Sequence, residues 1–218
     1  MNDSRRLDYW KTRRFIKDVG ISVFLLAVSF VINYLAGSYA TQKAGNSVED
    51  LILDRIPRMD MTLIFVYGPT LFWIFVGALL LHKPQRIPFT LKSIALFISI
   101  RSIFITLTHL GPAFEYSPGG ENFGEKLLNL FTFGGDLFFS GHTGLPFLMA
   151  LAFWQRPILR IIFFAASVIF GAGVLLGHLH YSIDVFAAFF ITYAIFHMAE
   201  FLFKKDRELF VHGLLEAP

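Results

Sequence analysis

The residues of this sequence best suited to nucleophilic or acid–base chemistry are two histidines and an aspartate: His142, His180 and Asp184. His180 and Asp184 are four residues apart, which places both side chains on one face of a helix. In that arrangement the carboxylate accepts a hydrogen bond from one imidazole nitrogen and leaves the other unprotonated and pointing away. The spacing therefore predicts that Asp184 orients His180 and activates it as a nucleophile or a base.

Further polar residues stand near these three in the sequence: Asp136, Ser140, Gly141 and His178. Arg101 is a cation expected near the middle of another apolar span. Simpler interpretations exist, because a histidine can be an interfacial polar residue, Asp184 can be favoured by a helix dipole and Asp136 can cap a helix. Two histidines and a carboxylate from separate spans at one depth are difficult to explain by packing, and such groups inside a membrane indicate function. A metal site of His178, His180 and Asp184 is the alternative, because the ligand types fit.

Long apolar segments must position these residues. Of the 218 residues, 55% are hydrophobic and 16% are charged, whereas soluble domains carry about a quarter charged residues. Uncharged apolar runs recur at the length that crosses roughly 30 Å of hydrocarbon. We therefore expect an all-α polytopic membrane protein, a bundle of six transmembrane helices in one domain over 1–218. The predicted spans are Val19–Ala36, Met61–Leu81, Ser93–Leu110, Leu137–Trp154, Ile161–Gly177 and Tyr181–Ala199.

Lysine and arginine residues are concentrated on one side of this expected bundle. They lie in an N-terminal arm (1–18), in the loops after the second and fourth spans, and in a tail (204–218) that follows the helical core (19–203). The loops on the other side hold fewer basic residues, among acidic ones such as Glu49, Asp50 and Asp54. Basic loops remain in the cytoplasm, so both termini should be cytoplasmic. The expected location is the inner membrane of a bacterium, with the polar site facing the periplasm.

One alternative for the first span is a secretory signal, since Leu35–Ala40 ends in small residues suited to cleavage. The long basic arm and the length of the apolar run favour a retained span. Five remaining spans would also put the two basic termini on opposite sides.

The sequence contains no cysteine, which excludes disulfides and thiolate metal sites. No nucleic-acid partner is expected.

Two motifs give the chain a resemblance to a known family. Residues 135–143 read Gly-Asp-Leu-Phe-Phe-Ser-Gly-His-Thr, which resembles the Gly-Asp-x-x-x-Ser-Gly-His-Thr motif of the sphingomyelin synthase family. Residues 178–185 read His-Leu-His-Tyr-Ser-Ile-Asp-Val, similar to the family's His-x-His-Tyr-Thr-x-Asp-Val. Arg101-Ser102 resembles the motif on the third span, and the first outer loop (Asp50–Pro57) resembles the first motif more weakly. The similarity covers about Asp50–Phe196. The family belongs to the lipid phosphate phosphatase superfamily, whose members are metal-independent.

The resemblance implies a phosphotransferase that moves the phospho-headgroup of a glycerophospholipid to ceramide, diacylglycerol or a similar lipid alcohol, as in a sphingomyelin or ceramide phosphoethanolamine synthase. It implies that His180 attacks phosphorus and becomes a phosphohistidine and that Asp184 orients His180. His142 would protonate the leaving alkoxide and then deprotonate the incoming hydroxyl. No metal and no cofactor are implied. Substrate-binding positions are expected at Arg101, Ser140, Gly141, Asp136, Tyr181 and His178.

The chain departs from the phosphatase branch of that superfamily, whose two further basic motifs, Lys-x6-Arg-Pro and Ser-Arg-x5-His, are missing. At the corresponding distances the chain has Met149 before Arg156-Pro157, and Gly173-Val174 before His180. A phosphomonoester is nearly a dianion and needs several cations, whereas a phosphodiester carries one negative charge. The missing cations favour an intact phospholipid as substrate. The alternatives are a hydrolase that uses water as acceptor and a non-enzymatic lipid-binding or transport protein. The headgroup, the acceptor and the oligomeric state stay open.

Overall fold

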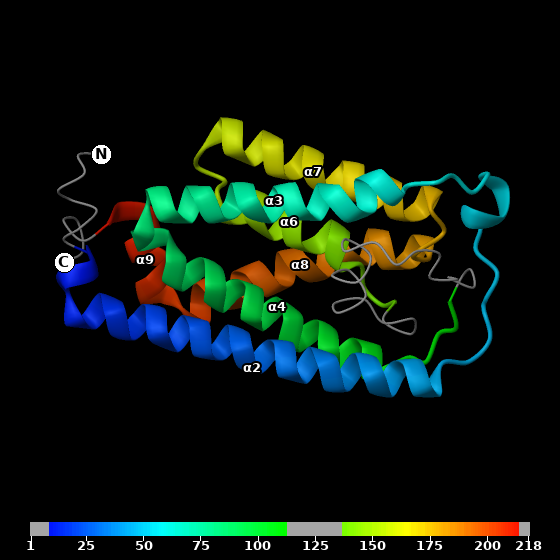
Figure 1. The fold of residues 1–218 in the computed structure, drawn as a ribbon, viewed down its shortest axis with the longest axis horizontal. Coiled ribbons are helices and arrows are strands. Elements are labelled where there is room, and N and C mark those ends of the chain that lie inside the picture. The colour runs from blue at the N-terminus through cyan, green and yellow to red at the C-terminus, as the bar shows by residue number, and fades with distance from the viewer. Residues whose placement is uncertain (1–8, 113–136, 214–218) are drawn as a thin grey trace.

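The computed structural model describes residues 9–112 and 137–213, and the regular elements in these ranges are helices (Figure 1). The all-α class expected from the sequence is therefore confirmed. The long helices are α2 (Arg13–Lys43), α3 (Thr62–His82), α4 (Ile87–Leu107), α7 (Pro157–Leu176) and α8 (Ser182–Leu202). The shorter elements are α6 (Gly141–Ala152), α9 (Lys204–His212) and the 3-10 turns η1 (Leu53–Arg55) and η2 (Pro84–Arg86).

Five of the described helices are long and apolar enough to cross a membrane: α2, α3, α4 together with η2, α7 and α8. Their outward faces carry large hydrophobic side chains with exposed fractions as high as 73% at Ile158, 77% at Phe190 and 84% at Phe201. Soluble proteins rarely expose apolar surface on this scale. The chain is therefore an integral membrane protein whose outer helix faces contact lipid.

These five helices match five of the predicted spans, with shifted ends. α2 extends beyond Val19–Ala36 in both directions. The predicted span ends where apolar residues end, whereas the helix continues into polar residues outside the hydrocarbon. α4 begins at Ile87, six residues before the predicted Ser93, with Pro88 in its first turn. Proline is favoured there, since its missing N–H has no helical acceptor at that position.

The predicted fourth span, Leu137–Trp154, is helical only over Gly141–Ala152. At 1.5 Å per residue α6 is about 18 Å long, well below the roughly 30 Å of a hydrocarbon core. The helix begins late because Ser140 caps its first turn, and the chain turns after Ala152 before Pro157 starts α7. The prediction of six spans is therefore not confirmed, and α6 is a short helix mostly buried inside the bundle.

Close packing of α4, α6 and α8 fixes the position of α6. A Cβ added to Gly144 would come within 2.6 Å of the Phe97 ring and 2.8 Å of Thr192 Oγ1, so a side chain at this position would force α4 and α8 away from α6. From the other side, the Ser167 hydroxyl in α7 donates a 2.7 Å hydrogen bond to the Thr143 carbonyl. The first turn of α6 is thereby held between the neighbouring helices.

The predicted C-terminal tail forms α9, which packs back onto the bundle. Asp206 makes a buried ion pair with Lys92 of α4 at 2.6 Å, and Arg207 donates a 2.9 Å hydrogen bond to the Ala152 carbonyl. The start of α2 and the end of α9 lie at this end of the bundle, whereas α8 begins at the opposite end (Figure 1).

Candidate active site

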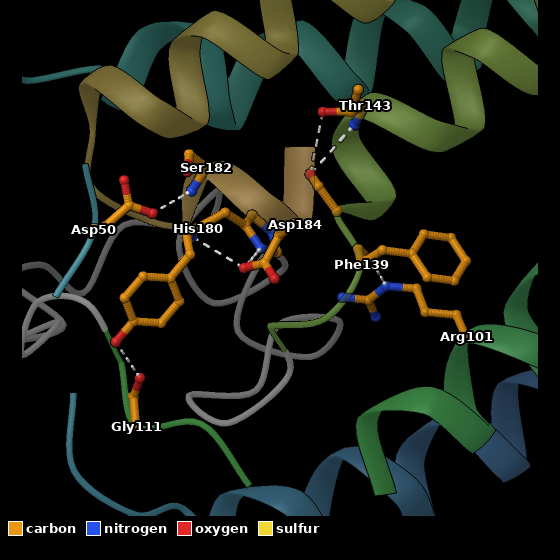
Figure 2. Close-up of polar contacts among 10 residues, drawn as sticks. Asp50, Arg101, Gly111, Phe139, Thr143, His180, Ser182 and Asp184 are labelled. Carbon is orange, nitrogen blue, oxygen red and sulfur yellow. Dashed lines mark hydrogen bonds and ion pairs between the residues drawn. The ribbon is translucent and has the colours of Figure 1, made fainter. Parts of the chain in front are cut away.

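Asp184 lies in the first turn of α8 and His180 lies just before the helix, so the capping geometry joins them rather than the shared helix face predicted from their spacing. Asp184 Oδ2 accepts a 3.0 Å hydrogen bond from the backbone N–H of Tyr181, the N-cap residue, a position that favours a carboxylate. The same oxygen lies 3.3 Å from His180 Nδ1 (Figure 2). Both residues are buried, Asp184 completely. With Nδ1 held by the carboxylate, Nε2 of His180 is left for chemistry.

The second histidine comes from the first turn of α6. Ser140 Oγ accepts a 3.4 Å hydrogen bond from the Thr143 N–H and so caps the helix. The first backbone N–H groups of a helix, here those of Gly141 and His142, have no acceptor within it and can bind an anion. The ring centroids of His142 and His180 are 6.3 Å apart. The two imidazoles are therefore close enough to act on one small group between them.

Phe65 of α3 stacks on the His142 ring, with centroids 4.3 Å apart and an interplanar angle of 29°. The contact restricts the orientation of the imidazole, because tilting the ring would break the stack. Phe65 was not identified from the sequence. The only available signal is an aromatic residue near the outer start of the second predicted span, and that signal does not specify a partner.

Arg101 brings a positive charge from α4 to the start of α6. Its side chain is buried, and Nε donates a 2.6 Å hydrogen bond to the Phe139 carbonyl (Figure 2). A Cβ added to Gly141 would lie 3.8 Å from that nitrogen, so Arg101 and the free N–H groups of α6 are neighbours. Arg101 lies six positions before Leu107, the last residue of α4. The side chain therefore lies closer to the outer end of α4 than the predicted mid-span position.

The first outer loop reaches the site through Asp50, a residue that the sequence identified only within a weakly matching segment. Asp50 Oδ2 accepts a 2.7 Å hydrogen bond from the Ser182 N–H at the start of α8 (Figure 2). Asp50 Oδ1 accepts bonds from the Ile52 and Leu53 N–H groups, at 2.9 and 3.1 Å. Burial opposes ionisation, but the hydrogen bonds from Leu53, Ser182 and Ile52 outweigh it and lower the pKa of Asp50. A charged carboxylate therefore ties the loop to α8.

Tyr181, an expected substrate-binding residue, joins the same loop to the chain beyond α4. Its hydroxyl donates a 2.9 Å hydrogen bond to the Gly111 carbonyl and accepts a 3.1 Å bond from the Val48 N–H. The ring is almost completely buried. Both hydrogen bonds of the hydroxyl are made with backbone groups. Tyr181, which follows His180 in the sequence, is therefore anchored to these two segments.

The structure brings together Arg101, Ser140, Gly141, His142, His180 and Asp184. His178 lies in the turn before α8 in the left-handed region (φ 55°). Its Nε2 is buried and has no hydrogen-bond partner in the described residues. No group of three possible metal ligands occurs within 9–112 and 137–213, so His178, His180 and Asp184 do not form one there. Asp136 lies outside the described residues.

Comparisons with known proteins match the part of the chain that holds the two histidines. The PAP2 superfamily C-terminal family matches residues 134–201, a range that contains His142, His180 and Asp184. Sphingomyelin synthase-related protein 1 of Mus musculus is 28% identical over 235 residues, which cover 89% of this chain and 46% of that protein. The protein of the same name in Homo sapiens is 28% identical over 232 residues, which cover 88% of this chain and 52% of the relative. The chain thus spans about half the length of these curated relatives. No solved structure gives a significant match.

Proposed function

Because the chain is a member of the superfamily that contains the sphingomyelin synthases and the lipid phosphate phosphatases, we propose that it transfers the phospho-headgroup of a glycerophospholipid to ceramide or a similar lipid alcohol. The observation that carries the proposal is the His180 Nδ1–Asp184 Oδ2 contact of 3.3 Å, with the His142 ring centroid 6.3 Å from that of His180. One oriented nucleophile and one acid–base group on opposite sides of a substrate are what a two-step displacement at phosphorus requires.

In the first step, His180 Nε2 attacks the phosphorus of the donor. A P–N bond forms, and the P–O bond to the glycerol oxygen breaks. His142 gives its proton to that oxygen, so diacylglycerol leaves as a neutral alcohol. In the second step, the acceptor hydroxyl passes its proton to His142 while its oxygen attacks phosphorus. The P–N bond breaks, and His180 recovers its electron pair.

Stabilisation of the phosphoryl oxygens is assigned to the start of α6 and to Arg101. The N–H groups of Gly141 and His142 supply donors, and the buried Arg101 guanidinium beside them supplies charge. Ser140 accepts both of its hydrogen bonds with Thr143, so its own hydroxyl proton remains available. One guanidinium with these neutral donors matches the single negative charge of a phosphodiester better than the near-dianion of a phosphomonoester.

The decisive experiment is mass spectrometry of the lipids formed by purified protein. The protein receives a phospholipid labelled in its headgroup, with and without ceramide. The expected result is a labelled ceramide phosphodiester together with unlabelled diacylglycerol. Labelled headgroup phosphate released into water, whether or not ceramide is present, would instead establish a hydrolase. Lipid binding without turnover in any donor and acceptor mixture would indicate the non-enzymatic alternative.

A further inference from the structure

The connections between α3 and α4 and between α6 and α7 lie at the end of the bundle that carries α9, whereas α8 begins at the opposite end (Figure 1). These two connections carry a cluster of three cations, Lys83, Arg86 and Arg156. Lys83 and Arg86 belong to one tight turn, in which the Arg86 N–H bonds the Lys83 carbonyl at 3.0 Å. Arg156 belongs to a second turn, in which its N–H bonds the Phe153 carbonyl at 2.8 Å. The Arg86 guanidinium lies 4.9 Å from the centroid of the Phe153 ring, so the two turns adjoin and their charged residues are neighbours in the fold.

The three side chains differ in depth. Arg86 is buried, Lys83 is half-buried and Arg156 is exposed. The cluster therefore has one positive charge inside the protein and others nearer its surface. Arg86 Nε is buried without a hydrogen-bond partner in the described residues. Burial, and then the charges of Arg86 and Arg156, lower the pKa of Lys83, which agrees with mutual repulsion among the three.

Two acidic side chains at this end, Asp206 and Glu200, form ion pairs with other residues. Asp206 pairs with Lys92 at 2.6 Å, and Glu200 pairs with His197 and Arg207. Within the part of the chain that the structure describes, Lys83, Arg86 and Arg156 form no ion pair. Partly buried like charges without a counter-ion are unfavourable, and an anion bound among them would remove that cost.

The surroundings of the cluster favour an anion that belongs to the membrane. Ile158 and Ile161 of α7 follow Arg156 and have exposed fractions of 73% and 63%, so a lipid-facing surface begins one turn away. Trp154 is half exposed, with the Arg160 guanidinium 4.7 Å from its ring centroid. A tryptophan of this kind is typical of the membrane–water interface. A phosphate held by the cluster would therefore lie at the level of the lipid headgroups.

We propose that Lys83, Arg86 and Arg156 form a binding site for the phosphate of an anionic phospholipid at the end of the bundle opposite the histidines. In this site the buried Arg86 donates hydrogen bonds to the phosphate from the protein side. Lys83 and Arg156 contact the phosphate from the two adjoining turns, and the acyl chains lie against α7. Basic pockets at helix ends bind anionic headgroups in this manner. The site is separate from the proposed chemistry and does not depend on it.

The test uses full-length protein in vesicles of phosphatidylcholine alone or with phosphatidylglycerol. Two readouts are taken: the phosphatidylglycerol retained per protein by native mass spectrometry, and the thermal unfolding midpoint. The test variant is Lys83→Gln/Arg156→Gln, which leaves the buried Arg86 in place and so keeps the fold. The control is Lys204→Gln/Lys205→Gln, which removes the same charge from two exposed residues of α9.

Wild-type and control proteins should retain phosphatidylglycerol and unfold at a higher temperature in its presence. The test variant should bind it roughly tenfold more weakly and lose most of the thermal shift. Equal loss in the control variant would mean attraction to surface charge in general, and would overturn the site. Inorganic phosphate added to phosphatidylcholine vesicles should give no shift. A shift of the same size would assign the cluster to a soluble anion and also overturn the proposal.

Discussion

The backbone N–H of Ser140 donates a 3.0 Å hydrogen bond to the backbone carbonyl of Asp184. This bond joins the residue that caps α6 to the residue that holds His180, so the two histidine motifs are connected by main chain. The distance between the imidazoles therefore depends on backbone geometry, which conservative side-chain changes leave intact. Substitutions of the individual histidines should then report on chemistry rather than on folding.

His180→Ala and His142→Ala should fail at different points of the reaction. A donor with a nitrophenol leaving group needs little protonation, because nitrophenolate leaves readily. His142→Ala should therefore still release a burst of nitrophenol and accumulate phosphoenzyme, whereas His180→Ala should show neither. Asp184→Asn should lie between them, since orientation is lost but the nucleophile remains.

The measurement is the trapping of acid-labile, base-stable phosphate on the protein, together with the burst of nitrophenol. Phosphate trapped on His180→Ala and absent from His142→Ala would reverse the assigned roles of the two histidines. Phosphoenzyme absent from the wild type under all conditions would argue against a covalent intermediate.

Asp50→Asn should weaken both the fold and the site, because the carboxylate binds N–H groups of its own loop and of Ser182. Hydrogen bonds to a charged group contribute about 1.5–3 kcal/mol each, so we expect a loss of roughly 1–3 kcal/mol in unfolding free energy. Turnover should fall while the KM for donor changes little, since Asp50 acts through α8. The matched control is Glu49→Gln, which removes the same charge from an exposed neighbour.

The pH dependence of this effect has a definite sign. The pKa of Asp50 is lowered in the folded protein, so its stabilisation is complete at neutral pH and is lost as the pH falls through that lowered value. The asparagine side chain of the variant does not titrate there. In thermal unfolding from neutral to acid pH, the gap between wild type and Asp50→Asn should narrow only below the ordinary pKa of aspartate. A gap that is constant down to strong acid would mean that the carboxylate charge is not the cause.

The contact between His180 and Asp184 could be predicted from their spacing of four residues, but a shared helix face could not, because α8 begins at Ser182 and His180 lies before its N-cap. The contacts that support the site could not, since those of Asp50, Tyr181 and Phe65 depend on the packing of segments distant in the sequence. The length of α6 was missed because apolarity continues from Leu137 to Trp154, whereas the helix limits are set by the Ser140 cap and by the turn before Pro157. Hydrophobicity predicts burial but does not predict caps.

Single cysteines should establish which side of the membrane the site faces, and the absence of native cysteine makes their labelling unambiguous. Glu49→Cys lies in the loop that contacts α8, and Gln155→Cys lies at the α9 end; both residues are exposed. Since basic residues are concentrated at the α9 end, we expect an impermeant thiol reagent to label only the Glu49→Cys variant in intact cells. The Gln155→Cys variant should react after permeabilisation. The opposite pattern would invert the topology and place the histidines on the cytoplasmic side.

Phe65→Leu should slow only the steps that need His142, because Phe65 touches the His142 ring and keeps it oriented. A stacked aromatic pair contributes about 0.5–1.5 kcal/mol, so turnover of a natural phospholipid should fall roughly two- to tenfold. The nitrophenol burst, which requires His180 but little protonation, should be unchanged. Phe24→Leu serves as the control, since Phe24 has an exposed fraction of 65% on α2 and should leave both rates intact. If Phe65→Leu lowers the burst and the phospholipid turnover by the same factor, Phe65 supports the bundle as a whole rather than the acid–base histidine.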